Sequence, residues 1–174
     1  MNIIQYPNIK ASLEEIEYWD VHPRKELYSA IQTEHLMKAN NLGAALFAAK
    51  YLHKIGGHLP ELLYMVFHKG SNPESLSNVV ALYETDAGFR TMGKTNTLLM
   101  ASNLTPYESR AKLADAYAQD LVHHGFNPHS WSPISLDKIP SYDWRRGKGN
   151  LSSMHGELGR IHGLTKKDFT HKIM

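Results

Sequence analysis

Apolar and polar positions follow the period of a helix in the first part of the chain. Segment 12–19, SLEEIEYW, opens with Ser12 and Glu15, the spacing of a capping box. A second helix is predicted from Pro23 to about Lys38, because proline is favoured in the first turn of a helix. The pattern therefore predicts two short helices before residue 40.

Two further helices are predicted before the polar break SNPES. In segment 41–57, leucine and alanine recur every three or four positions, and Gly56 and Gly57 would end the helix. Segment 60–70, PELLYMVFHKG, is apolar all round, which is typical of a buried helix. We expect an N-terminal group of four helices.

After that break the pattern changes to that of strands. Segment 78–84, NVVALYE, is rich in valine and aromatic residues, and TDAG after it has turn composition. Segments 89–92 (FRTM) and 97–102 (TLLMAS) are two more short strand candidates. These segments predict a small antiparallel sheet.

The clearest helix of the chain is predicted over 105–125. Thr105 is its expected cap, Pro106 lies in the first turn, Glu108 completes a capping box, and Gly125 ends it. Its apolar stripe is Leu113, Ala114, Tyr117 and Leu121.

Segment 126–151 is predicted to be irregular and held to the body by Trp131 and Trp144, and the C-terminus returns to helix. The expected fold is α+β: a helical group, a small antiparallel sheet, one long amphipathic helix and a basic helical C-terminus. Its core should contain Leu46, Leu52, Leu62, Val80, Leu82, Leu99, Leu113, Tyr117 and Leu121.

Composition sets limits on domains, location and chemistry. With 174 residues, 42% of them hydrophobic, the chain can bury one core, which we assign to 1–143 with a tail over 144–174. It has no cysteine, so disulfides and thiolate metal sites are excluded. There is no signal-like start and no apolar run long enough to span a membrane. We expect a cytoplasmic protein without a cofactor.

Positive charge gathers near the C-terminus. From Asp137 to Met174 there are eight lysines and arginines against four acids, whereas acids slightly outnumber bases in the rest of the chain. Such asymmetry is typical of a basic region that meets an anionic partner.

Segment 152–174, SSMHGELGRIHGLTKKDFTHKIM, resembles a helix-turn-helix motif. A first helix would cover 153–162, Gly163 would form the turn, Leu164 would enter the core, and a second helix would start at Thr165. The resemblance implies that Lys166, Lys167 and Thr170 face a DNA groove or its backbone.

Upstream, WRRGKGN forms a basic arm. Arg145, Arg146 and Lys148 would hold phosphates there. A terminal helix pair of this kind also suits a homodimer that binds paired half-sites. Without DNA contact, the same segment would be an amphipathic hairpin docked on the body or on a partner.

Segment 88–95, GFRTMGKT, has the letters of a phosphate-binding loop, with Gly93, Lys94 and Thr95 as its nucleotide-binding residues. Its spacer residues are bulky, and alternating strand–helix units are missing around it. We favour a hairpin turn in which Gly93 has a positive φ.

The eleven histidines do not form a sequence pattern typical of zinc. His123 and His124 at a helix end are better explained by the helix dipole. No catalytic motif is recognisable, so we assign no catalytic or metal-binding residue.

The leading hypothesis is a small regulatory or accessory protein, of a kind suited to a phage or mobile element, that binds nucleic acid through its C-terminal region. DNA is favoured over RNA, and the protein would act by occlusion or recruitment. The alternative is an inhibitor or adaptor that binds a protein partner and no nucleic acid. A third hypothesis is a nucleotide-using enzyme built on GFRTMGKT.

Overall fold

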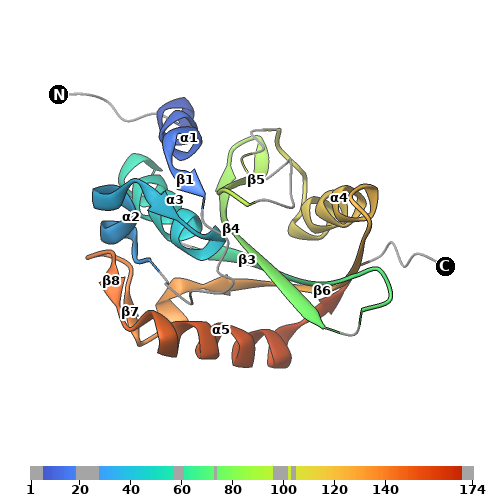
Figure 1. Ribbon diagram of the computed structural model, residues 1–174. Helices are drawn as coiled ribbons and strands as arrows, with labels where there is room; N and C mark the ends of the chain where they lie inside the picture. Colours follow the sequence, from blue (N-terminus) through green and yellow to red (C-terminus); the bar gives the residue numbers. More distant parts are fainter. Residues whose placement is uncertain are drawn as a thin grey trace.

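An antiparallel sheet with helices on both faces organises the chain, as the computed structural model shows (Figure 1). The structure describes residues 6–18, 28–56, 61–72, 74–95, 102 and 105–169. In chain order the elements are α1 (Tyr6–Glu15), β1 (Glu17–Tyr18), α2 (Ala30–Leu36), β2 (Lys38–Ala39), α3 (Asn41–Gly56), β3 (Glu61–Lys69), β4 (Ser75–Thr85), β5 (Gly88–Met92), α4 (Arg110–His123), β6 (Phe126–Ser135), η1 (Leu136–Lys138), β7 (Tyr142–Asp143), β8 (Lys148–Gly149), α5 (Leu151–Thr165) and β9 (Lys167–Asp168). The predicted α+β class is confirmed.

The main sheet has the strand order β5-β4-β3-β6-β9, with every neighbouring pair antiparallel. β3 is central, and its alternate side chains enter two different cores. Leu62 and Tyr64 pack with α1, α3 and α5 on one face, whereas Leu63 and Met65 pack against α4 on the other. Because both faces are covered, β3 is apolar at every position from Leu62 to Phe67.

The predicted fourth helix over 60–70 is wrong, because this segment is strand β3. A strand buried on both faces and a helix buried all round share one sequence pattern, a short continuous apolar run. The predicted strand over 78–84, the turn after it and the strand over 89–92 are confirmed as β4, a turn and β5. Of the last strand candidate, residues 97–101 lie outside the described residues, and Ser102 is in a turn.

The irregular segment predicted after residue 125 is also wrong, because its first part is the long strand β6. Pro128 and Pro133 suggested a loop. However, β9 pairs with β6 at Ser130 and Trp131, and the described residues of β9 leave the rest of that edge uncovered. Proline is tolerated where its missing N–H would face an open edge. Trp131 and Trp144 are both buried, as predicted.

The apolar stripe predicted for α4 is confirmed, but its start is not. Ser109 rather than Thr105 is the N-cap, and its hydroxyl accepts from the backbone N–H of Lys112 at 3.1 Å. The residues before it are extended, because Tyr107 pairs with Phe89 through two backbone hydrogen bonds. Tertiary pairing therefore delays the helix.

Two N-terminal helix starts also differ from the prediction. α2 begins after Ser29, which forms a capping box with Gln32, and not at Pro23, which lies outside the described residues. Ser12 does not cap a helix but lies near the end of α1. Ser12 therefore has the spacing of a cap in the sequence but lies within a helix in the structure.

The C-terminal helix-turn-helix prediction is wrong over the described residues. α5 starts after the Asn150 cap and runs without a turn through Gly163. Leu164, predicted in the core, is 76% exposed. Where a second helix was expected, Lys167 and Asp168 form β9 instead. Residues 170–174 lie outside the described residues.

The described part of 144–174 is not a separate tail. Trp144, Leu151, Met154 and Leu158 belong to the same core as α1 and α3. The predicted core residues that the structure describes are all buried: Leu46, Leu52, Leu62, Val80, Leu82, Leu113, Tyr117 and Leu121. Leu99 lies outside the described residues.

Candidate nucleic-acid interface and an adjoining pocket

A tight turn between β7 and β8 presents the first group of predicted basic residues. Asp143 organises the turn, because its Oδ1 accepts from the backbone N–H groups of Arg145 and Arg146 at 3.0 and 3.2 Å. Gly147 has φ of 69° and accepts a backbone hydrogen bond from Ile31 of α2 at 3.2 Å. The turn is therefore tied to the body, and its two arginines point outward.

Trp144 anchors this turn to the core of the protein. Its ring is buried, and its Nε1–H donates to Oδ1 of Asp137 at 2.7 Å. The His53 ring of α3 meets it edge-on, with 4.6 Å between centroids. The Arg145 guanidinium lies 4.2 Å from the ring centroid, a cation–π geometry. This contact orients Arg145 while its side chain remains 69% exposed.

Carboxylates stand near both arginines, but at the long end of ion-pair distances. Arg145 is 3.9 Å from Asp137, and Arg146 is 3.6 Å from Asp143. The arginine side chains are 69% and 74% exposed. Exposed pairs of this kind contribute about 0–1 kcal/mol, so a bound phosphate can replace them at little cost.

α3 adds two lysines that the sequence interpretation did not include. A Cβ built on Gly147 would lie 3.4 Å from Cδ of Lys50, so the turn touches this side chain. Lys54, one helical turn further along α3, is exposed. We call Lys50, Lys54, Arg145, Arg146 and Lys148 the α3–hairpin surface. The spacing of Lys50 and Lys54 was visible in the sequence, but the contact of Lys50 with Gly147, almost a hundred positions away, was not.

The second group of predicted basic residues lies at the other end of α5. Lys166 and Lys167 follow its last turn, and a helix of 15 residues is about 22 Å long. Figure 1 shows β7 and β8 beside α2 at one end of α5, with the chain leaving the other end toward the C-terminus. Lys167 lies 5.3 Å from the ring centroid of Trp131. The six predicted residues therefore do not form one footprint, and Thr170 lies outside the described residues.

In the Gly93-Lys94-Thr95 segment, Lys94 forms hydrogen bonds with the protein itself, at the C-terminal end of α1. The Lys94 ammonium donates to the backbone carbonyls of Leu13 and Glu14, at 2.9 and 3.0 Å, and to that of Ile16. It thus satisfies carbonyls at the C-terminal end of α1. The start of the motif, Gly88–Met92, is a paired strand rather than a curled loop.

The positive φ predicted for Gly93 is wrong, whereas residues 96–101 of the predicted hairpin lie outside the described residues. The positive φ occurs at Gly88, with a value of 130°. Gly93 is required for space instead, since a Cβ there would lie 3.0 Å from Cγ1 of Val80.

Histidine positions give no metal centre among the described residues. His124 caps α4, and its Nδ1 lies 2.7 Å from the carbonyl oxygen of Asp120. His162 lies on the buried face of α5, and its ring is within hydrogen-bond distance of the hydroxyls of Ser130 and Ser132 on β6. Burial, together with the nearby Lys166 and His129, lowers the pKa of His162 below its ordinary value.

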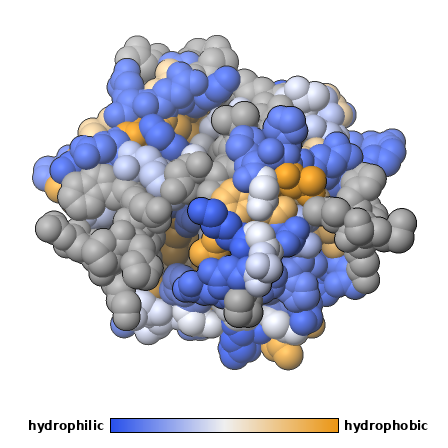
Figure 2. Space-filling view, turned by 45° about the vertical axis from the view of Figure 1, so that its right-hand side comes forward, coloured by the Kyte–Doolittle hydropathy of each residue, from blue (hydrophilic) through white to orange (hydrophobic). Residues whose placement is uncertain are grey.

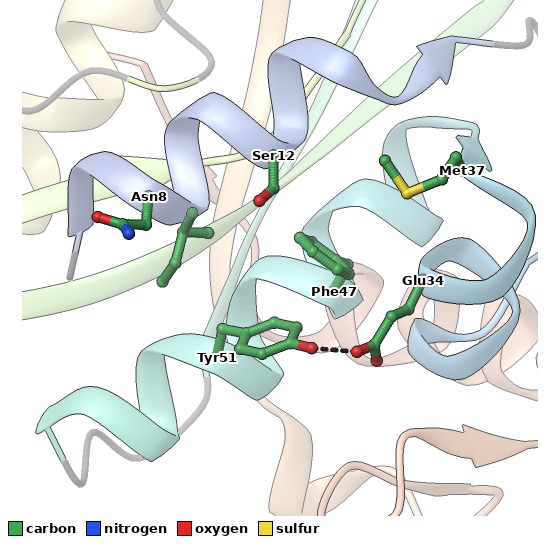
Figure 3. Close-up of a pocket in the computed structure, with 7 residues that line it drawn as sticks. Asn8, Ser12, Glu34, Met37, Phe47 and Tyr51 are labelled. Atoms are coloured by element: carbon green, nitrogen blue, oxygen red, sulfur yellow. Dashed lines mark hydrogen bonds between the residues drawn. The ribbon is translucent and has the colours of Figure 1, made fainter. Parts of the chain in front are cut away.

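A pocket of about 340 Å³ opens between α1, α2 and α3, at the edge of the α3–hairpin surface. Figure 3 shows side chains from these three helices around it. The lining residues are Asn8, Ile9, Ser12, Glu34, Met37, Phe47 and Tyr51. No local sequence pattern predicted this pocket, because its walls come from three separate segments.

A charged network borders the pocket. Glu34 accepts a hydrogen bond from the Tyr51 hydroxyl and forms an ion pair of 3.0 Å with Lys50. Partial burial opposes ionisation of Glu34, but the hydrogen bonds from Tyr51 and Lys50 outweigh it and lower its pKa. Burial, and then the bond to Glu34, raise the pKa of Tyr51 to about 12. At neutral pH the network therefore holds a carboxylate, a neutral phenol and an ammonium group.

Comparison of the chain with known proteins does not indicate a family. No protein-family model matches the chain, and no curated protein matches it. Within the ranges that the structure describes, no helix is both long and apolar enough to cross a membrane.

Proposed function

We propose that the protein binds nucleic acid, DNA in preference to RNA, through the α3–hairpin surface. The observation that carries this proposal is the contact between the β7–β8 turn and α3. It brings the exposed Arg145 and Arg146 of the turn beside α3, where Lys50 touches the turn and His53 touches Trp144. Lysines and arginines on one face are the electrostatic footprint of phosphate binding.

The mode of binding follows from the weak pairing of Arg145 and Arg146 with their carboxylates. Phosphates would displace Asp137 and Asp143 from the arginines, while Trp144 keeps Arg145 in place. The surface contains no reactive group, so the protein would act by occlusion or recruitment. We expect it to do so in the cytoplasm. A homodimer and a role in a phage or mobile element remain predictions from the sequence.

A protein-binding adaptor is the second candidate, and exposed apolar side chains favour it. On and just after α2, Ile31, Leu36 and Met37 are 43%, 47% and 38% exposed. Exposed apolar groups of this kind mark protein contacts when they are contiguous. The face in Figure 2 is mainly hydrophilic, with its hydrophobic atoms in small separate areas. We rank nucleic acid first because Arg145 and Arg146 are exposed on a turn that is tied to the body.

A nucleotide-using enzyme built on Lys94 has less support. Its ammonium already satisfies three carbonyls of α1, so it is not directed at a phosphate.

Fluorescence anisotropy with a labelled mixed-sequence DNA duplex tests the proposal. Affinity should fall steeply between about 50 and about 200 mM salt, because each phosphate contact adds about 0.9 to the slope of log K against log salt. If no binding is measured at low salt, the nucleic-acid proposal is wrong. Capture of a protein partner that resists the same salt would favour the adaptor instead.

A further inference from the structure

From the pocket beside the α3–hairpin surface we infer that the protein binds single-stranded nucleic acid by inserting one unpaired base. The base would lie between α1 and α3, and its phosphate would lie on Lys54. This inference rests on the proposed function and specifies its preferred substrate. The same chemistry, a nucleobase with a phosphate, is also present in a free nucleotide.

The size and lining of the pocket fit one flat ring system. Its volume, about 340 Å³, is at the small end of the range for ligand pockets, about 300–1,000 Å³. Ile9 and Phe47 are buried and form apolar walls. Phe47 and Tyr51 both line the pocket, and their rings pack against each other at 4.9 Å and 54°. Aromatic side chains of this kind are stacking platforms for unpaired bases.

Polar groups at the rim can recognise a base edge. Glu34 has a lowered pKa and is ionised, and each oxygen of a carboxylate can accept more than one hydrogen bond. It can therefore accept from a base amino group while it keeps Tyr51 and Lys50. Asn8 and Ser12, across the pocket on α1, supply both donors and acceptors (Figure 3).

Two lysines connect this pocket to the α3–hairpin surface. The ammonium groups of Lys54 and Lys50 lie 5.0 and 5.7 Å from the Tyr51 ring centroid. Lys50 is paired with Glu34, whereas Lys54 is exposed and can meet a phosphate. A strand that follows the arginines of the turn would thus pass Lys54 at the mouth of the pocket. A paired base inside a duplex cannot enter.

Met37 forms part of the pocket rim, directly after α2. It is the C-cap of this helix: with φ of 51°, its backbone N–H donates to the carbonyl of Thr33 at 2.9 Å, and helices commonly end in such a left-handed conformation. Methionine is also a flexible side chain that adapts to the shape of a ligand. Its position across from Phe47 suits a wall that closes on a base (Figure 3).

The test compares one labelled dodecanucleotide with its own duplex by fluorescence anisotropy. The wild-type chain should bind the single strand about tenfold more tightly, as expected for one stacked base. Tyr51→Leu should abolish this preference. The matched control is Tyr107→Leu, which replaces another half-buried tyrosine, packed in the other core. It should retain the preference.

Competition by the four nucleoside monophosphates separates the two sources of the base. If a monophosphate displaces the single strand, the pocket also accepts a free nucleotide. If no monophosphate displaces the strand, the pocket is specific for a base within a strand. Both results are compatible with the inference. Equal affinity for strand and duplex, or a preference that survives Tyr51→Leu, would overturn it and leave the proposed function standing. Failure to bind either DNA would refute both.

Discussion

The two ends of α5 carry similar residues in different surroundings. At each end a cation lies above a buried tryptophan: Arg145 over Trp144 before the helix, and Lys167 over Trp131 after it. At the first end, α3 adds Lys50 and Lys54 and a tied turn fixes the backbone. At the second end, Lys167 lies on a strand of two residues at the sheet edge. The difference shows that tertiary neighbours, and not position along the chain, make a basic surface.

The largest effect should come from removing the anchor of the first end. Trp144→Ala deletes a buried ring that contacts His53 and Arg145 and donates to Asp137. Loss of a buried tryptophan costs about 3–5 kcal/mol, which urea denaturation can measure. A loss below about 1 kcal/mol would contradict the anchoring role.

The buried His162 should make the docking of α5 depend on pH. It faces Ser130 and Ser132 of β6 and the Tyr64 ring of β3, with Lys166 and His129 nearby. The pKa of His162 is lower in the folded chain than in the unfolded chain, so the unfolded chain binds a proton at this residue more readily.

This contribution to stability is complete above the ordinary pKa of 6.5 and is lost as pH falls below that value. The slope approaches about 1.4 kcal/mol per pH unit while only the unfolded chain is protonated. Urea denaturation of His162→Gln should show a smaller slope between about pH 6.5 and 5 than the wild-type chain. Identical slopes would contradict this prediction.

Two glycine substitutions should have opposite effects at the two ends of α5. Gly147→Ala forces a side chain onto φ of 69° and within 3.2 Å of Ala30, so it should cost about 1–2 kcal/mol. Gly163 is helical and nothing lies near its Cβ position. Gly163→Ala should therefore stabilise the protein by roughly 0.5–1 kcal/mol. Thermal unfolding of both variants checks the signs, and a stabilising Gly147→Ala would mean that the turn is not tied as described.

The sequence predicted the parts of the fold that depend on local pattern. The α4 stripe from Leu113 to Leu121 was recognisable by its helical period, and the strand over 78–84 by its valine and aromatic residues. β3 was mistaken for a helix, since burial on both faces removes the alternation that marks a strand. β6 was missed because its prolines imitate a loop.

The candidate site was predicted only in part. Arg145, Arg146 and Lys148 were named because they stand together in the sequence. Lys54 and the pocket at Tyr51 were not, since contacts between α3 and the turn link residues that are far apart in the chain. Lys166 and Lys167 were grouped with the arginines by a helix-turn-helix pattern that the continuous helix α5 does not form.

The most direct test compares DNA binding of two double variants that each remove two positive charges. Arg146→Gln/Lys148→Gln changes the α3–hairpin surface, and Lys166→Gln/Lys167→Gln changes the far end of α5. The first should lower affinity for a DNA duplex and reduce the slope of log K against log salt by up to about 2. The second should match the wild-type chain. Equal losses in both variants, or a loss in the second alone, would contradict the assignment of binding to the α3–hairpin surface.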